Sequence, residues 1–192
     1  LGPRDIPEKV ATASEMIFLE GYLFDKNQGK EAFRQASRMT RTAGGRAGIA
    51  ISDPFCVNRH RNDFIEMIKN DLDFVIGNEH EIKSLYETND LEAAMSKTAD
   101  MIKLMVCTRS GDGVTIMSNG ERHDIPVNKI TPVDATGAGD QFAAGFIYGM
   151  VTGRYLETCG KMGNLCAAEV ISHIGPRPAT DMRREFARAR LE

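Results

Sequence analysis

Apolar and polar positions alternate along the chain in blocks whose lengths are typical of strands and helices. Short apolar runs bounded by polar or glycine residues predict buried strands at residues 15–22, 47–53, 73–78 and 104–108. Segments with apolar residues at every third or fourth position predict helices at about residues 28–42, 58–70 and 89–101. Strands that alternate with helices in this way favour right-handed crossovers and a parallel sheet covered by helices.

The last part of the chain is expected to hold a hairpin and further helices. The Asn119-Gly120 pair lies between segments 114–117 and 121–127, and such a pair favours a tight hairpin turn. Apolar spacing predicts helices at residues 141–150 and 155–173, and residues 181–190 are expected to form a short, charged terminal helix. No repeat or linker interrupts the pattern, so we predict one three-layer α/β domain over residues 1–192, with a mainly parallel sheet.

Composition narrows the classes of partner. A net charge of -3 and a pI near 5.9 give no reason to expect nucleic acid or an anionic membrane as a partner. No apolar run approaches the roughly 20 residues that a membrane-spanning helix needs. The four cysteines form no Cys-x-x-Cys pair and show no zinc-like spacing, so we expect reduced thiols in a cytoplasmic protein.

A glycine-rich loop at residues 134–140 runs directly into an apolar helix whose Phe142 and Phe146 are four residues apart. Such a turn leaves the first N–H groups of the helix without partners, and with the helix dipole these groups favour an anion. Asp140 would repel a bound phosphate, so it fits better as a base that takes a proton from an attacking hydroxyl. The alternative is that Asp140 only stabilises its own helix, and that the glycines only permit tight packing.

Two other polar segments follow predicted strands. Asn78 and Glu81 have the spacing of a capping box, and they stand at the carboxyl end of strand 73–78, where α/β proteins bind ligands. Residues 108–113 form a polar turn with two glycines after strand 104–108. As a bare pattern this turn is only a loop, and Arg109 within it either faces an anionic ligand or points to solvent.

Together these segments carry a resemblance to a known family. The string Asp-Ala-Thr-Gly-Ala-Gly-Asp at 134–140, followed by Phe-Ala-Ala-Gly-Phe, closely resembles the signature of the ribokinase-like (PfkB-type) carbohydrate and nucleoside kinases. The Asn-x-x-Glu pair and the 108–113 turn resemble two further motifs of that family, in the family's order. The chain departs from the common pattern at Ala135 and at Ser110, where many relatives carry other residues.

The resemblance implies ATP-dependent phosphorylation of a sugar or nucleoside hydroxyl. In that case Asp140 is the base, the N–H groups of Ala138, Gly139 and Asp140 hold the transferring phosphoryl group, and Gly137 shapes the turn. Adenosine is the favoured acceptor, followed by ribose or fructose, because the tail at 173–178 is similar to that of adenosine-kinase-like members.

The same resemblance implies the remaining binding residues. Asn78 and Glu81 would act on Mg²⁺ through water. The nucleotide would be held by Thr108, Ser110, Gly111, Gly113 and Asn164, the last either at the adenine or merely exposed on its helix. Asp134 and Thr136 resemble positions that bind a monovalent cation such as K⁺ in some relatives.

Relatives carry a further N-terminal part with lid strands and most acceptor contacts, so we expect this chain to be the C-terminal part of such a protein. A homodimer would then form through the absent lid. A non-catalytic relative that senses a nucleotide or sugar is the alternative function. A dinucleotide-binding oxidoreductase is disfavoured, because residues 21–24 lack the glycine pattern that such a domain needs after its first strand.

Overall fold

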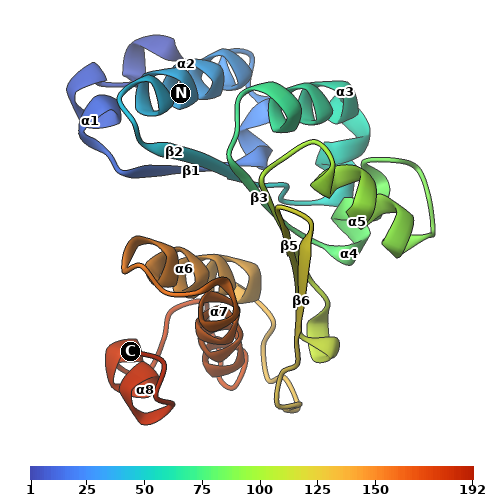
Figure 1. The fold of residues 1–192 in the computed structure, drawn as a ribbon, viewed down its shortest axis with the longest axis vertical. Helices are drawn as coiled ribbons and strands as arrows, with labels where there is room; N and C mark the ends of the chain where they lie inside the picture. Colours follow the sequence, from blue (N-terminus) through green and yellow to red (C-terminus); the bar gives the residue numbers. More distant parts are fainter. The chain divides into compact units, whose positions relative to one another are not determined.

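The computed structural model describes residues 1–192 (Figure 1). Six strands form one sheet in the order β1-β2-β3-β4-β5-β6, which confirms the α/β class and the mainly parallel sheet. The contacts of the chain divide it into two compact units, residues 1–107 with 117–121 and residues 108–116 with 122–192. The expectation of one domain over residues 1–192 stays a prediction.

The first unit alternates strands and helices. Its elements in chain order are η1 (Pro3–Asp5), α1 (Glu8–Ala13), β1 (Met16–Glu20), η2 (Gly21–Asp25), α2 (Gly29–Thr42), β2 (Arg46–Ala50), α3 (Pro54–Asn70), β3 (Phe74–Asn78), α4 (Glu79–Ser84), α5 (Leu91–Ala99) and β4 (Leu104–Thr108), whose last residue belongs to the second unit. Each predicted strand and helix of this unit is present, whereas the short helices before β1 were not predicted.

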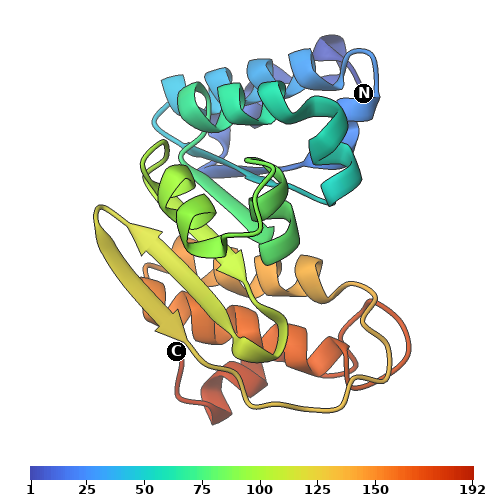
Figure 2. The ribbon, with the colours of Figure 1, turned by 90° about the vertical axis from the view of Figure 1, so that its right-hand side faces the viewer.

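The second unit contains the hairpin and the C-terminal helices. Its elements are η3 (Ser110–Asp112), β5 (Val114–Ser118), β6 (Glu121–Ile125), α6 (Ala138–Val151), α7 (Leu156–Val170) and α8 (Met182–Arg188), with the tip of the hairpin assigned to the first unit. Asn119 and Gly120 have positive φ of 51° and 83°, which confirms the predicted tight turn. Figure 2 shows the hairpin in yellow.

Strands β1, β2 and β3 pair in parallel, and Phe18, Gly48 and Phe74 lie in one row across them. A Cβ at Gly48 would overlap the ring of Phe74. The missing side chain lets the Phe18 and Phe74 rings stack with centroids 5.9 Å apart. This row keeps the three strands in register.

The core of the first unit lies between the sheet and its helices. Phe64 and Ile68 of α3 are fully buried in it, while Ile65 is only partly buried. The Phe24 ring of η2 stacks on Phe64 with centroids 4.3 Å apart, so the segment after β1 is fixed against α3.

Helix α3 begins one turn earlier than the predicted start at Asn58. The Asp53 carboxylate caps it by accepting a hydrogen bond of 2.8 Å from the N–H of Cys56, and Pro54 occupies the first turn. Proline is well suited to this position, since the N–H that it lacks would have no helical partner. Pro54 therefore opens a helix, and β2 ends earlier, at Ala50.

In the second unit α6 packs closely against α7, and α8 packs on α7 (Figure 1). A Cβ at Gly145 would lie 2.6 Å from the carbonyl oxygen of Met162, and one at Gly149 would lie 2.8 Å from Cys159 Sγ. These two glycines allow the helices to approach. No disulfide joins the four cysteines of the chain, which agrees with the expected reduced thiols, and all four side chains are buried. No helix combines the length and hydropathy that a membrane span requires.

Candidate functional site

The loop before α6 is shaped by a glycine in the left-handed conformation. Gly137 is the N-cap of α6 with φ of 82°, a value that favours glycine. A Cβ at this position would also lie 2.7 Å from the Cβ of Pro176. Both the backbone conformation and the close neighbour therefore require glycine here.

The first turn of α6 presents backbone donors beside open space. The N–H of Ala138 donates to the Ala135 carbonyl at 3.2 Å, and that of Gln141 donates to the Gly137 carbonyl at 2.9 Å. The N–H groups of Gly139 and Asp140 donate to no neighbour in this unit. A Cβ at Gly139 would meet nothing within 4 Å, and Asp140 is exposed. Of the three predicted phosphoryl donors, Ala138 is thus already engaged, while Gly139 and Asp140 are available.

Asp134 ties this loop to the segment that follows α7. Its two carboxylate oxygens accept hydrogen bonds of 2.9 Å from the N–H groups of Thr136 and Gly175. The Thr136 and Gly175 hydrogen bonds lower the pKa of Asp134 from 3.8 to about 2. The N–H of Val133 also donates to the Ile171 carbonyl at 2.8 Å. Asp134 therefore has a structural task in this loop.

Glu169 and His173 support the same segment, and sequence reasoning missed both. Glu169 Oε1 accepts a hydrogen bond of 2.8 Å from the N–H of Ala179 and lies 3.4 Å from His173 Nε2. Glu169 lies near the end of α7 and His173 follows the helix; their spacing of four residues is the only sequence signal, and it is too common to identify a role. They hold the chain that returns past Gly175.

The turn after β4 is closed by its own backbone. The N–H of Arg109 donates to the Gly113 carbonyl at 2.7 Å, and the N–H of Gly113 donates to the Ser110 carbonyl at 3.1 Å. Gly113 has φ of 88°, and a Cβ there would overlap the Ile125 carbonyl. Ser110 adopts φ of 50° although it has a side chain, and Ser110 and Gly111 are exposed. The predicted nucleotide turn thus exposes its middle residues.

Arg109 does not point freely to solvent. Its Nη1 donates to Thr115 Oγ1 at 3.1 Å and lies 3.7 Å from Asp124 Oδ1. Thr115 in turn donates to Asp124 at 2.7 Å. Arg109 therefore binds the hairpin, which neither of the two sequence interpretations anticipated.

Asn164 of α7 is buried, so its interpretation as an exposed surface residue is wrong. Its Nδ2 lies 3.5 Å from the Ile125 carbonyl and 3.4 Å from the Pro126 carbonyl. The side chain thus holds the chain that leaves β6. Its role at an adenine stays a prediction.

In the first unit, Asn78 and Glu81 form the capping box of α4. Asn78 Oδ1 accepts from the N–H groups of His80 and Glu81, and the Glu81 carboxylate accepts from the Asn78 N–H at 2.8 Å and Nδ2 at 2.6 Å. Burial raises the pKa of Glu81 from 4.5 to about 7, and the charges of Asp53 and Glu20 raise it as well. The pair stands at the carboxyl end of β3, as predicted.

These residues fit Mg²⁺ held through water. Mg²⁺ prefers oxygen ligands and retains several of its waters. Both Glu81 oxygens already accept hydrogen bonds from Asn78, which leaves them suited to water contacts more than to direct ligation. The charges of Asp53 and Glu20 that disfavour ionised Glu81 would be offset by a cation nearby.

The predicted site residues therefore fall into two groups. Thr108, the 110–113 turn, Asn164 and the whole 134–140 loop belong to the second unit, whereas Asn78 and Glu81 belong to the first. Within the second unit, loop 134–140 is hydrogen-bonded to the segment after α7. Lys129, which lies between β6 and this loop, places its Cε 3.8 Å from where a Cβ at Gly111 would be.

Comparison with known proteins agrees with these motifs. An uncharacterized sugar kinase of Archaeoglobus fulgidus is 34% identical over 121 residues, which make up 62% of this chain and 47% of that protein. The crystal structure of a probable sugar kinase protein from Rhizobium etli CFN 42 has a TM-score of 0.97 at 39% identity, covering 100% of this chain and 59% of that one. The adenosine kinase from Sinorhizobium meliloti has a TM-score of 0.95 at 39% identity, covering 98% and 58%.

The chain thus spans between 47% and 59% of the length of these relatives. A family model described as pfkB family carbohydrate kinase matches residues 4–182, nearly the whole chain. This match includes loop 134–140, the 108–113 turn and the Asn78–Glu81 pair. The chain belongs to the pfkB family of carbohydrate kinases.

Proposed function

We propose that the protein containing this chain transfers the γ-phosphoryl group of ATP to a hydroxyl group of a sugar or nucleoside. The observation that carries the proposal is the first turn of α6, where the N–H groups of Gly139 and Asp140 have no partner in their unit. The space beside Gly139 is open, and packing alone would allow a side chain at this position. Such a turn suits the close approach of a phosphate.

Asp140 acts as the base in this proposal. It is exposed in the first turn of α6, beside the two available donors. A carboxylate in that place accepts the proton of the attacking hydroxyl while the N–H groups stabilise the charge on the transferring phosphoryl group. Gly137 fixes the turn, and Ala138 contributes through its backbone geometry more than through its engaged N–H. Positioning and charge stabilisation dominate this kind of reaction.

The turn after β4 holds the nucleotide. Ser110 and Gly111 are exposed there, Gly113 closes the turn through its backbone, and Thr108 precedes the turn as the last residue of β4. Asn164 supports the neighbouring chain and contacts the base only through its remaining acceptor. The Arg109 side chain is hydrogen-bonded to Thr115 of the hairpin, and this contact anchors the turn.

Asn78 and Glu81 would hold Mg²⁺ through water, and that ion would neutralise phosphate charge when bound. Asp134 and Thr136 are proposed as part of a monovalent-cation position, with K⁺ as the candidate. Asp134 already accepts two N–H hydrogen bonds, so any cation would share a carboxylate that also fixes the loop.

We favour adenosine as the acceptor, followed by ribose or fructose. The adenosine kinase from Sinorhizobium meliloti supports a nucleoside, since it is 39% identical to this chain. The sugar kinases of Archaeoglobus fulgidus and Rhizobium etli keep sugars under consideration.

An ATP-consumption assay with Mg²⁺ on the intact protein tests this proposal. The assay offers adenosine, other nucleosides, ribose and fructose separately, with a reaction lacking acceptor as the control. We expect acceptor-dependent formation of ADP together with a phosphorylated product. ATP or adenosine binding by calorimetry without turnover on any acceptor would contradict the kinase and favour a sensor.

A further inference from the structure

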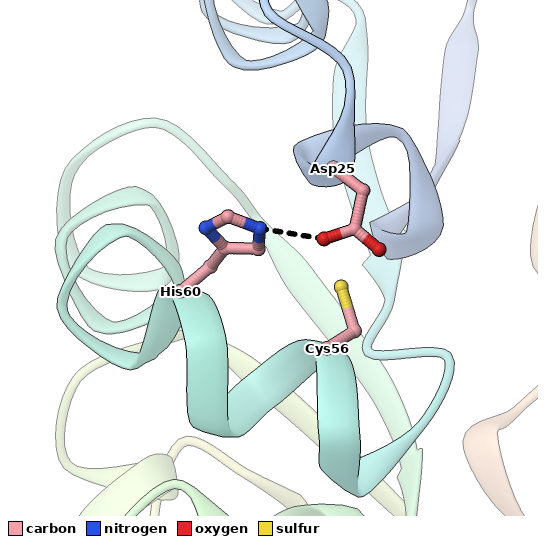
Figure 3. Close-up of side chains that lie close together, drawn as sticks. All are labelled: Asp25, Cys56 and His60. Carbon is pink, nitrogen blue, oxygen red and sulfur yellow. Dashed lines mark hydrogen bonds and ion pairs between the residues drawn. The ribbon is translucent and has the colours of Figure 1, made fainter.

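A group of side chains of metal-binding types lies in the first unit, and none of its members belongs to the proposed kinase site. The carboxylate of Asp25, the thiol of Cys56 and the imidazole of His60 place their ligand atoms within 4.8 Å of one another (Figure 3). Asp25 ends η2, which follows β1, and the other two lie on α3, which follows β2. Because β1 and β2 are parallel neighbours, the two segments emerge at the same edge of the sheet.

Local structure directs the three side chains toward one point. Cys56 and His60 are four residues apart and therefore share one face of α3. At His60 the helix departs from helical geometry, with φ of -128° and ψ of 22°, and there is no proline or glycine at the bend. His60 Nε2 lies 2.7 Å from Asp25 Oδ1, and the Cys56 sulfur points toward the same carboxylate (Figure 3).

We propose that Asp25, Cys56 and His60 form a binding site for one Zn²⁺ ion. Zn²⁺ takes thiolate sulfur, imidazole nitrogen and carboxylate oxygen as ligands, and a site with three protein ligands leaves a fourth position for water. Mg²⁺ and Ca²⁺ require oxygen ligands, so a thiol with an imidazole excludes them. The cysteine spacing did not reveal the site because two of its ligands are not cysteines.

The geometry needs only a small adjustment to accept the ion. Ligand atoms about 2.0 to 2.3 Å from a tetrahedral Zn²⁺ lie roughly 3.3 to 3.7 Å from one another. The three atoms already lie within 4.8 Å of one another, and the Asp25–His60 pair, at 2.7 Å, must open to admit the ion. The Asp25 side chain is 37% exposed and can move, whereas Cys56 is buried and fixes the floor of the site.

Arg59 competes with the ion for the Asp25 carboxylate and would also orient that carboxylate once the ion is bound. Its Nε donates to Asp25 Oδ1 at 3.0 Å and its Nη2 donates to Oδ2 at 2.6 Å. Zn²⁺ would replace the first contact and leave the second, so that Arg59 orients the ligating carboxylate, as partners of metal ligands commonly do. The Cys56 thiol, now 3.3 Å from the Gly21 carbonyl, would lose its proton and bind through sulfur.

Metal titration of the reduced, tag-free protein tests the site, with Zn²⁺ measured by calorimetry and Co²⁺ by absorption. We expect one ion per chain and a thiolate-to-cobalt charge-transfer band. Cys56→Ala should abolish that band, and Asp25→Asn and His60→Gln should each weaken Zn²⁺ binding at least tenfold. Cys107→Ala is the matched control, because Cys107 is as deeply buried in the same unit, and it should bind as the wild type does.

Two outcomes would overturn the proposal. One is a wild-type protein that binds neither ion at stoichiometric concentration. The other is a charge-transfer band that persists in Cys56→Ala, which would assign the thiolate to another cysteine. If Cys56→Ala fails to fold, Asp25→Asn and His60→Gln decide the question through the Zn²⁺ affinity alone, and unchanged affinity in both overturns it.

Discussion

Two glycines of α6 have different reasons to be glycine, one in the packing of the fold and the other in the proposed function. Gly145 lies where a Cβ would be 2.6 Å from a carbonyl oxygen of α7, whereas a Cβ at Gly139 would meet nothing. Packing therefore explains Gly145 and leaves Gly139 unexplained. A phosphate that approaches the first turn of α6 accounts for Gly139.

We predict opposite effects for alanine at these positions. Gly139→Ala should leave the free energy of unfolding unchanged or raise it by up to about 1 kcal/mol, since alanine favours a helix. The added methyl group should nevertheless reduce phosphoryl transfer. Gly145→Ala should lower the free energy of unfolding by about 1–3 kcal/mol through overpacking. Urea unfolding and steady-state kinetics measure both effects, and a Gly139→Ala enzyme with normal turnover would contradict the role of the open face.

Ser110 is a second residue whose backbone predicts an outcome. It adopts φ of 50°, a conformation that costs a residue with a side chain about 1–2 kcal/mol relative to glycine. Ser110→Gly should therefore preserve or slightly raise stability. The ATP dissociation constant should change little if the turn binds phosphate through its backbone. A loss of ATP binding greater than tenfold would show instead that the hydroxyl group is a direct contact.

At the scale of elements, the cap of α4 links a helix start to a proposed metal site. Asn78→Ala removes the acceptor for two N–H groups and the donor to Glu81. We expect a loss of about 0.5–2 kcal/mol in unfolding free energy. We also expect weaker Mg²⁺ binding, because Glu81 loses its orientation. Half-maximal turnover should then require a higher Mg²⁺ concentration.

Asp90→Ala provides the control for this prediction. Asp90 caps α5 by accepting from the Ala93 N–H at 3.0 Å, and it belongs to no proposed site. Its removal should lower stability by a similar amount without altering the Mg²⁺ dependence. Equal changes in Mg²⁺ dependence for both variants would reduce Asn78 to a structural cap.

Elements were predictable where the signal was local. The Asn119-Gly120 turn, the capping box at Asn78 and the strand at 104–108 depend on neighbouring residues, and the structure agrees with each. The start of α3 was misplaced because Pro54 can end a strand or open a helix, and the Asp53 side chain decides between them. The same ambiguity limits most helix boundaries.

Site residues were predictable only where a motif ran along the chain. Loop 134–140 has this property, but the links that fix it do not. Gly175 donates to Asp134 of the loop from 41 residues away, and Glu169 accepts from Ala179, ten residues further along the chain. Arg109 binds Thr115 and Asp124 for the same kind of reason. Such partners depend on tertiary packing, which a single sequence does not encode in a readable pattern.

For the whole molecule, the raised pKa of Glu81 leads us to predict how the free energy of unfolding varies with pH. Its pKa is raised from 4.5 to about 7, chiefly by burial, so the folded state binds a proton more tightly than the unfolded state. Stability from this group is complete below about pH 4.5 and is lost as the pH rises through about 7. The loss amounts to about 3 kcal/mol at most.

Glu81→Gln should flatten this dependence, because glutamine does not ionise. Urea unfolding of the intact protein without Mg²⁺, repeated from about pH 4 to about pH 8, measures the difference between wild type and variant. The difference should shift in favour of the variant as the pH rises. Parallel profiles for the two proteins would contradict the raised pKa.

The central claim is that Asp140 serves as the base beside the phosphoryl-binding turn, and single-turnover phosphoryl transfer by Asp140→Asn in the intact protein tests it most directly. The account predicts ATP affinity close to wild type and a transfer rate lower by about 10²- to 10⁴-fold. Glu31→Gln is the matched control, since Glu31 also lies in the first turn of a helix, and it should transfer at the wild-type rate. A rate for Asp140→Asn within a few-fold of that control would contradict the claim and leave Asp140 as a residue that only stabilises its helix.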